Sequence, residues 1–312
     1  MRIRNVVYAG LLLLSFLLSG CSGNDTNSDE YPSEYPDSQG YTIDDLLLAD
    51  SPEETVAEDD NHYIHIDYSN ASKGYIRIKR LVDDGVRIKI QMINNDITLA
   101  DNRRFDYYEL FKVGEYETIP IVYGSGNYSI KLWRNTIDTK YQMKQEWKIP
   151  IQLESEQTPF LYPNQTVDYD ASTKAIAYAF TLCQNETNDL KRIRVLYDYV
   201  VNNIKYDDDK KEATQNLYVI PVIDETFETN KGICFDYAAL FAAMCRSQHI
   251  PCKVVVGNTK IEYHAWVEVW LNGTGWINPE VLFESDAWTR MDPTFAASKA
   301  DYDGYYETIY EY

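Results

Sequence analysis

The chain has 312 residues, which is enough for two folded domains, and 45% of them are hydrophobic, which is enough to fill two cores. Its formal net charge of −20 and isoelectric point near 4.5 argue against nucleic acid as a partner, because a phosphate backbone would be repelled. The same charge excludes a membrane contact made through a basic surface.

The first 20 residues have the pattern of an export signal. Arg2 and Arg4 precede an apolar run at 6–18, which is too short for a membrane-spanning helix. The run ends in Leu18-Ser19-Gly20-Cys21, which resembles the lipobox of bacterial lipoproteins. This resemblance implies that residues 1–20 are removed and that Cys21 carries a lipid. The protein would then be exported and anchored to the outer face of the cell membrane. A plain secretory signal with an incidental cysteine is the alternative.

An acidic segment follows the signal. Residues 22–60 contain 13 Asp and Glu and no Lys, Arg or His. Such a segment repels itself and has little apolar surface to bury, so we expect 21–60 to be a disordered tether.

Residues 61–155 predict an all-β sandwich of the Ig-like kind. Short stretches such as 75–79 and 86–90 alternate apolar with polar residues, turn signals separate them, and no helical period is present. His62 and His65 lie near the start of this domain. Three apart in a strand, they would point to opposite faces, so we expect no metal ion between them.

The pattern changes in residues 156–300. A helical period covers 172–183 and 189–204, and an acidic-basic loop at 207–212 and an irregular segment at 214–230 come next. A helix then lies within 231–252. The strands predicted after it are 253–257, 262–271 and 288–292, and 301–312 is read as a C-terminal tail.

Cys234 lies in the first turn of the helix within 231–252. Unpaired backbone N–H groups and the positive end of the helix dipole favour thiolate over thiol at this position. The alternative is a small buried hydrophobe, because an apolar stripe continues along the helix. Three further cysteines follow the tether, with a spacing that fits neither a disulfide framework nor a zinc site, so we expect free thiols: Cys183, Cys245 and Cys252.

His264 is the candidate base. A thiol nucleophile needs a base within hydrogen-bond reach, and the base needs a partner that fixes its tautomer. Of the four histidines, His249 follows the cysteine helix at the end about 20 Å from Cys234. His264, on the alternating strand 262–271, is the histidine that remains.

Three segments of this half resemble successive motifs of the transglutaminase-like superfamily, whose core is similar to that of papain-type proteases. They are Gly232-Ile233-Cys234-Phe235-Asp236-Tyr237-Ala238, Tyr263-His264-Ala265-Trp266 and Trp288-Thr289-Arg290-Met291-Asp292-Pro293-Thr294. The resemblance implies an α+β fold in which helices pack on an antiparallel sheet, preceded here by the β-sandwich. It assigns Cys234 as nucleophile, His264 as base and Asp292 as the orienting acid. The signal and the β-domain resemble the architecture of Gram-positive surface proteins of this type.

One departure affects the third catalytic residue. The family usually places its acid soon after the histidine strand, whereas Asp292 is 28 residues beyond His264. Asn278 follows the nearer tryptophan, Trp276, and could orient a histidine as an amide does in papain-type enzymes. We therefore keep Asn278 as the alternative to Asp292.

These residues predict a thiol-dependent acyl transfer on peptide or protein amides, including those of the cell wall. Acceptance of the acyl group by water gives a protease or amidase, and acceptance by an amine gives a transglutaminase. The reaction needs no cofactor, and we expect no metal. The competing hypothesis is a surface binding or scaffold module that keeps the fold without catalysis.

Overall fold

The computed structural model describes residues 37–51, 56–97, 105–214, 217, 219–259, 263–277 and 306–312. Cys21, Asn278 and Asp292 lie outside these residues, and so do the export signal and the strand predicted at 288–292. Within the described part of the chain, no helix combines the length and apolar character needed to cross a membrane.

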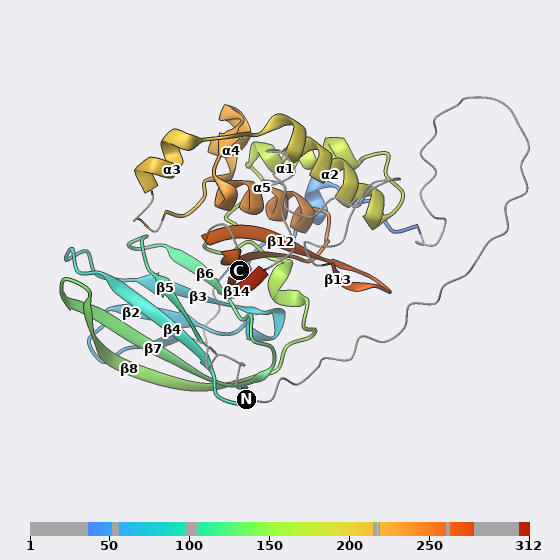
Figure 1. Cartoon of the computed structure of the whole chain (residues 1–312). Helices are drawn as coiled ribbons and strands as arrows, with labels where there is room; N and C mark the ends of the chain where they lie inside the picture. Colours follow the sequence, from blue (N-terminus) through green and yellow to red (C-terminus); the bar gives the residue numbers. More distant parts are fainter. Residues whose placement is uncertain are drawn as a thin grey trace, which may run out of the picture. The chain divides into compact units, whose positions relative to one another are not determined.

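The first folded region is a sandwich of two four-stranded antiparallel sheets, as the alternating pattern predicted (Figure 1). Alternate residues of the inner strands are buried between the sheets, as Ile76 and Ile78 show for one sheet and Ile88 and Ile90 for the other. One sheet has the order β1 (Val56–Glu58), β2 (Ile64–Asp67), β3 (Tyr75–Arg80) and β6 (Tyr116–Pro120). The other has the order β5 (Phe105–Glu109), β4 (Ile88–Asn94), β7 (Gly126–Ile137) and β8 (Lys140–Ile151).

Residues 37–51, which the sequence analysis assigned to the acidic tether, are docked onto the folded region. The ring of His249 stacks on Tyr41 with centroids 3.8 Å apart, and its Nε2 lies 2.6 Å from the main-chain oxygen of Asp45. His249 itself has φ of +57°, a left-handed conformation that ends a helix. The acidic composition of 21–60 indicates only that its charges repel one another on average. Docking depends on individual contacts, which composition does not show.

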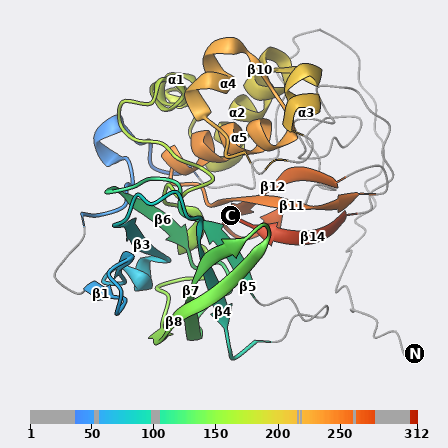
Figure 2. The same ribbon diagram turned by 90° about the vertical axis from the view of Figure 1, so that its left-hand side faces the viewer.

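The second region packs helices on an antiparallel sheet. The sheet has the order β13 (Gly275–Ile277), β12 (Tyr263–Leu271), β11 (Cys252–Thr259) and β14 (Tyr306–Glu311). The helices are α1 (Lys174–Cys183), α2 (Asp189–Asn203), α3 (Asp208–Thr214), α4 (Ile223–Thr229) and α5 (Cys234–Ser247). Figures 1 and 2 show the helices on one side of this sheet and the sandwich on the other. The predicted α+β arrangement, with helices packed on an antiparallel sheet, is confirmed.

Three segments differ from the sequence prediction. The loops expected at 207–212 and 214–230 contain α3 and α4, which are too short to show a clear helical period. The tail expected at 301–312 supplies strand β14, which pairs with β11. Its tyrosines and β-branched residues favour a strand, but the pairing needs a neighbour about 50 residues earlier in the chain.

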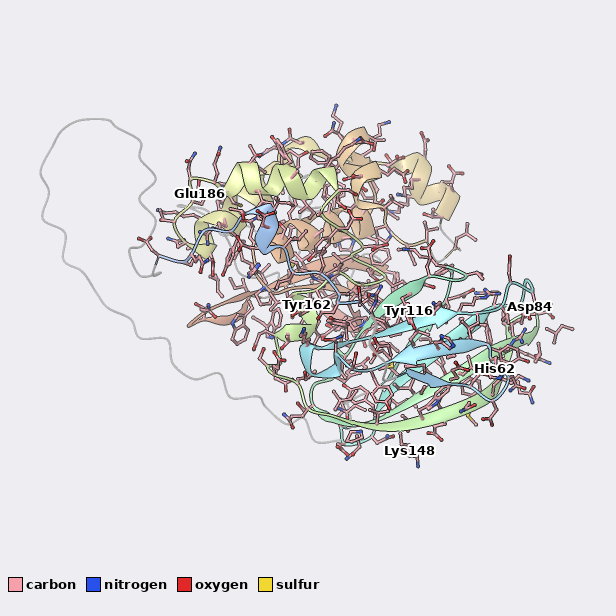
Figure 3. All side chains as sticks on the ribbon, turned by 180° about the vertical axis from the view of Figure 1, so that it is seen from behind. His62, Asp84, Tyr116, Lys148, Tyr162 and Glu186 are labelled. Atoms are coloured by element: carbon pink, nitrogen blue, oxygen red, sulfur yellow. The ribbon has the colours of Figure 1, made fainter. Side chains whose placement is uncertain are left out.

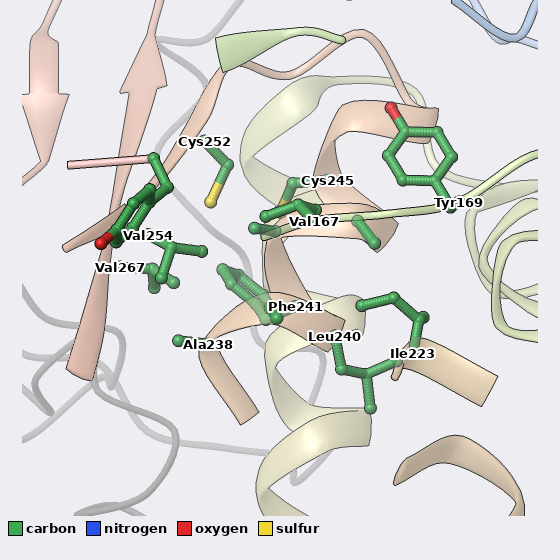
Figure 4. Close-up of a cluster of buried hydrophobic side chains, with 14 of the residues drawn as sticks. Val167, Tyr169, Ile223, Ala238, Leu240, Phe241, Cys245, Cys252, Val254 and Val267 are labelled. Carbon is green, nitrogen blue, oxygen red and sulfur yellow. The ribbon is translucent and has the colours of Figure 1, made fainter. Parts of the chain in front are cut away.

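Helix α5 is buried on every side rather than along one stripe. All residues from 236 to 247 are buried, since β11 and β12 cover one side and α1, α2 and α4 cover the others. Figure 4 shows Phe241 of α5 beside Val254 and Val267 of the sheet. The small alanines of the helix let its neighbours approach closely.

Arg246, near the end of α5, is fully buried. Its guanidinium donates to the main-chain oxygen of Cys252 through Nε at 3.0 Å and Nη2 at 2.8 Å. It also donates to the main-chain oxygens of Tyr162 and Tyr312, each at 2.8 Å. Burial lowers the pKa of Arg246, because it penalises the charged form. One side chain therefore connects α5 to three places: the linker between β8 and α1 that contains Tyr162, the start of β11, and the residue that follows β14.

The sandwich and the helical region meet through β5, β14 and the linker. Tyr108 packs edge to face on Tyr312, with ring centroids 6.2 Å apart. Gln165 donates through Nε2 to the main-chain oxygen of Glu109 and to the Glu117 carboxylate, both at 2.6 Å. Asp106 is buried near the same boundary. Burial raises its pKa to about 7, and the nearby Glu311 carboxylate adds to the rise.

We predict that Arg246→Ala lowers the free energy of unfolding by about 3–5 kcal/mol, because it removes a fully buried guanidinium that donates four hydrogen bonds to main-chain oxygens. Urea unfolding measures the change. Arg194→Ala is the matched control, since it removes an ion pair with the exposed carboxylate of Asp198 and should cost less than about 1 kcal/mol. Equal losses in the two variants would contradict the assigned role of Arg246.

Asp106→Asn should change stability in a pH-dependent way. A carboxyl whose folded pKa is raised from 3.8 to about 7 contributes stability at low pH that is lost as pH rises through this range. The difference in unfolding free energy, variant minus wild type, should therefore increase by about 2 kcal/mol between about pH 5 and about pH 8. Urea titrations at both pH values measure it, and a pH-independent difference would show that Asp106 titrates normally.

Candidate active site

The backbone before α5 sets the position of Cys234. Strands β9 (Lys205–Tyr206) and β10 (Lys231–Gly232) form a short parallel ladder that fixes the entry to the helix. The main-chain N–H of Ile233 donates to Asp236 Oδ2 at 2.9 Å. Gly232 is required here, because a Cβ at this position would lie 2.7 Å from the Cβ of Asp236. Cys234 is thus the first residue of α5, and its side chain is partly exposed.

Asp236 is a site residue that the sequence reasoning missed. It is 2% exposed and forms an ion pair with Lys210 of α3, with Oδ2 and Nζ 2.8 Å apart. An aspartate at the third position of a helix was the available signal, since it can accept from the N-cap N–H group. The ion pair depends on α3, which the sequence presented as a loop. The two interactions hold the first turn of α5 in place.

His264 is placed by β12. Its side chain is 1% exposed, and its backbone pairs with Gly257 of β11. A side chain at Gly257 would collide with the neighbouring strand, because a Cβ there would lie 1.9 Å from the main-chain oxygen of Glu307. Gly257 therefore lets β14 pack closely beside β11, the strand that pairs with the one that carries His264.

Cys234 and His264 line one cleft of about 600 Å³. The sandwich supplies one wall through Arg87, Lys89, Tyr107 and Glu109, and the helical region supplies another through α3 and the chain that follows it. The structure therefore brings together the two described members of the predicted triad. Asp292 and Asn278 lie outside the described residues, so the choice between them stays a prediction.

The other cysteines that the structure describes do not line the cleft and are buried free thiols. Burial raises the pKa of Cys183 to about 12 and raises the pKa of Cys245, which also hydrogen-bonds to Cys252. Cys252 pairs with Val269, five residues along β12 from His264, which corresponds to about 17 Å. The Cys245 end of α5 therefore lies away from the cleft, as the polarity of the helix predicted.

His62 and His65 differ from their predicted arrangement. Both approach Glu58, with Nδ1 of His62 2.8 Å and Nε2 of His65 2.7 Å from its carboxylate oxygens. His62 has φ of +55° and lies in the turn before β2, so strand alternation does not apply to it. Among the residues that the structure describes, no group of three or more His, Cys, Asp or Glu side chains could hold a metal ion.

Residues 176–293, which include Cys234, His264 and Asp292, match the family model of the transglutaminase-like superfamily. The match identifies a transglutaminase-like domain in this part of the chain. YebA of Bacillus subtilis, an uncharacterized protein, is 25% identical over 165 residues, which are 45% of this chain and 21% of YebA. The kyphoscoliosis peptidase of Mus musculus is 30% identical over 104 residues, which are 30% of this chain and 15% of the peptidase. The matched part thus spans only a minor share of either relative.

Two solved structures also align with the chain. The alignment with a structure from Cytophaga hutchinsonii covers 80% of this chain and 87% of that chain, with 15% sequence identity and a TM-score of 0.35. The alignment with red sea bream transglutaminase covers 70% of this chain and 50% of that chain, with 12% sequence identity and a TM-score of 0.28.

Proposed function

We propose that this protein is a thiol-dependent acyl-transfer enzyme that acts on peptide or protein amides at the bacterial cell surface. The observation that carries the proposal is the cleft shared by Cys234, at the start of a buried helix, and His264, on the adjacent sheet. The transglutaminase-like family supports thiol-dependent acyl transfer in general. The name of the mouse relative, a peptidase, is consistent with amide bonds as substrates.

In the proposed reaction, His264 removes the proton from the Cys234 thiol, and the thiolate attacks the amide carbonyl carbon. A C–S bond forms, and the carbonyl electron pair moves to the oxygen. The Cys234 backbone N–H, which the helix leaves unpaired at its first residue, is placed to donate to this oxyanion. Protonated His264 then gives its proton to the leaving amine as the C–N bond breaks, which leaves an acyl-enzyme.

The second half of the reaction sets the product. Water gives hydrolysis and an amine gives transamidation, and in both cases His264 takes a proton from the attacking group. Asp292 is the proposed partner that orients His264, with Asn278 as the alternative. No cofactor takes part in this scheme.

The proposed location rests on the lipobox-like segment that ends at Cys21. Cys21→Ser should remove the lipid and shift the protein from the membrane fraction to the medium of a Gram-positive host. Fractionation and metabolic labelling with a fatty acid measure this. Equal membrane retention of the variant and the wild type would refute the anchor without affecting the chemistry.

Incubation of the purified protein with a peptide library and a primary amine tests the chemistry. Mass spectrometry should detect hydrolysed or amine-linked peptides with the wild type and none with Cys234→Ala. His264→Ala should reduce the rate by about 10³-fold or more. The same loss in either Asp292→Ala or Asn278→Ala would identify the orienting residue. Lys148→Ala, which changes a surface residue of the sandwich, is the control. Peptides that are neither hydrolysed nor linked to the amine, together with slow alkylation of Cys234, would favour the binding-module hypothesis.

A further inference from the structure

The wall that the sandwich gives to the active-site cleft is positively charged, although the chain as a whole carries a formal charge of −20. Arg87 and Lys89 line the cleft from the sandwich and Lys211 lines it from α3. Glu109 is the one acidic residue among the described residues of this lining. The cleft thus departs from the acidic surface that the composition predicts.

The contacts of these side chains show where the surplus charge lies. Arg87 and Glu109 form a two-point ion pair, with Nε–Oε1 and Nη2–Oε2 distances of 2.6 Å each, so their charges offset one another. The Lys89 ammonium lies 4.9 Å from the centre of the Tyr141 ring. Within the described part of the chain, Lys89 has no carboxylate partner. Lys89 is therefore a cation without local neutralisation at the edge of the cleft.

The same cleft exposes large apolar side chains. Tyr107 on β5 is 43% exposed, Leu217 after α3 is 67% exposed and Tyr263 on β12 is 57% exposed. All three line the cleft. Apolar groups that gather in a concave surface beside a few charged groups are typical of a ligand site.

Building on the proposed function, we propose that this cleft selects acidic protein segments. Lys89 and Lys211 attract a carboxylate close to the reacting amide, and Tyr107 and Leu217 cover an adjacent apolar side chain. A carboxylate is the complementary partner, because a cation at the edge of a partly enclosed cleft repels basic peptides and strengthens the binding of anions. The sandwich then contributes to the substrate specificity of the enzyme.

A pair of alkylating reagents tests the charge at Cys234 without a known substrate. Iodoacetate is an anion and iodoacetamide is its neutral counterpart, and peptide mapping reads their rates at Cys234. The ratio of the two rates, iodoacetate over iodoacetamide, should fall by about threefold to tenfold in Lys89→Glu at low ionic strength. Lys89→Gln should give a smaller fall. The difference between variants should shrink in about 1 M salt, where the Debye length is about 3 Å.

Lys148→Glu is the matched control. Lys148 is exposed on β8 of the same sheet and does not line the cleft, and Figure 3 labels it on the sandwich. The substitution changes the net charge of the protein equally but should leave the ratio within about twofold of wild type. An equal fall in Lys89→Glu and Lys148→Glu, or no fall in either, would overturn the proposal.

Substrates give the second readout. With matched peptides that differ only in Glu or Gln beside the reacting amide, the wild type should prefer Glu, and Lys89→Glu should remove or reverse that preference in kcat/KM. Fast alkylation that depends on His264, with an unchanged ratio in Lys89→Glu, would refute acidic selection alone. Slow alkylation by both reagents that is indifferent to His264→Ala would refute the proposed function itself.

Discussion

The buried guanidinium of Arg246 is the interaction on which the helical region depends. Its hydrogen bonds to Tyr162, Cys252 and Tyr312 join three chain segments to the end of α5. A cation held away from water is stable only when its donors are satisfied, so these segments cannot move independently of the helix. The orientation of α5 against the sheet follows from this constraint.

A fixed α5 determines where the thiol lies. The buried end of the helix is held by Arg246, and the opposite end is held by Asp236, Lys210 and the β9–β10 ladder. Cys234 is therefore presented at the rim of the core, where it is partly exposed, while the other described cysteines are buried. Among the described cysteines, the fold thus leaves Cys234 accessible and buries the others.

The sandwich has a place in the site as well as in the architecture. Its strands β4 and β5 reach the cleft that holds Cys234 and His264, and Gln165 and Tyr312 fasten them to the helical region. The sandwich would not need these contacts if it served only as a spacer. The strands that line the cleft therefore also pack against the helical region.

The sequence by itself determined the α+β class, the β-sandwich, the helix that begins at Cys234 and the strand that carries His264. These features follow from local periods, turn residues and motifs. Only the tertiary structure decided the docking of 37–51, the pairing of β14 and the placement of the sandwich wall beside Cys234. Each of these depends on contacts between residues far apart in the chain, which a local pattern does not encode.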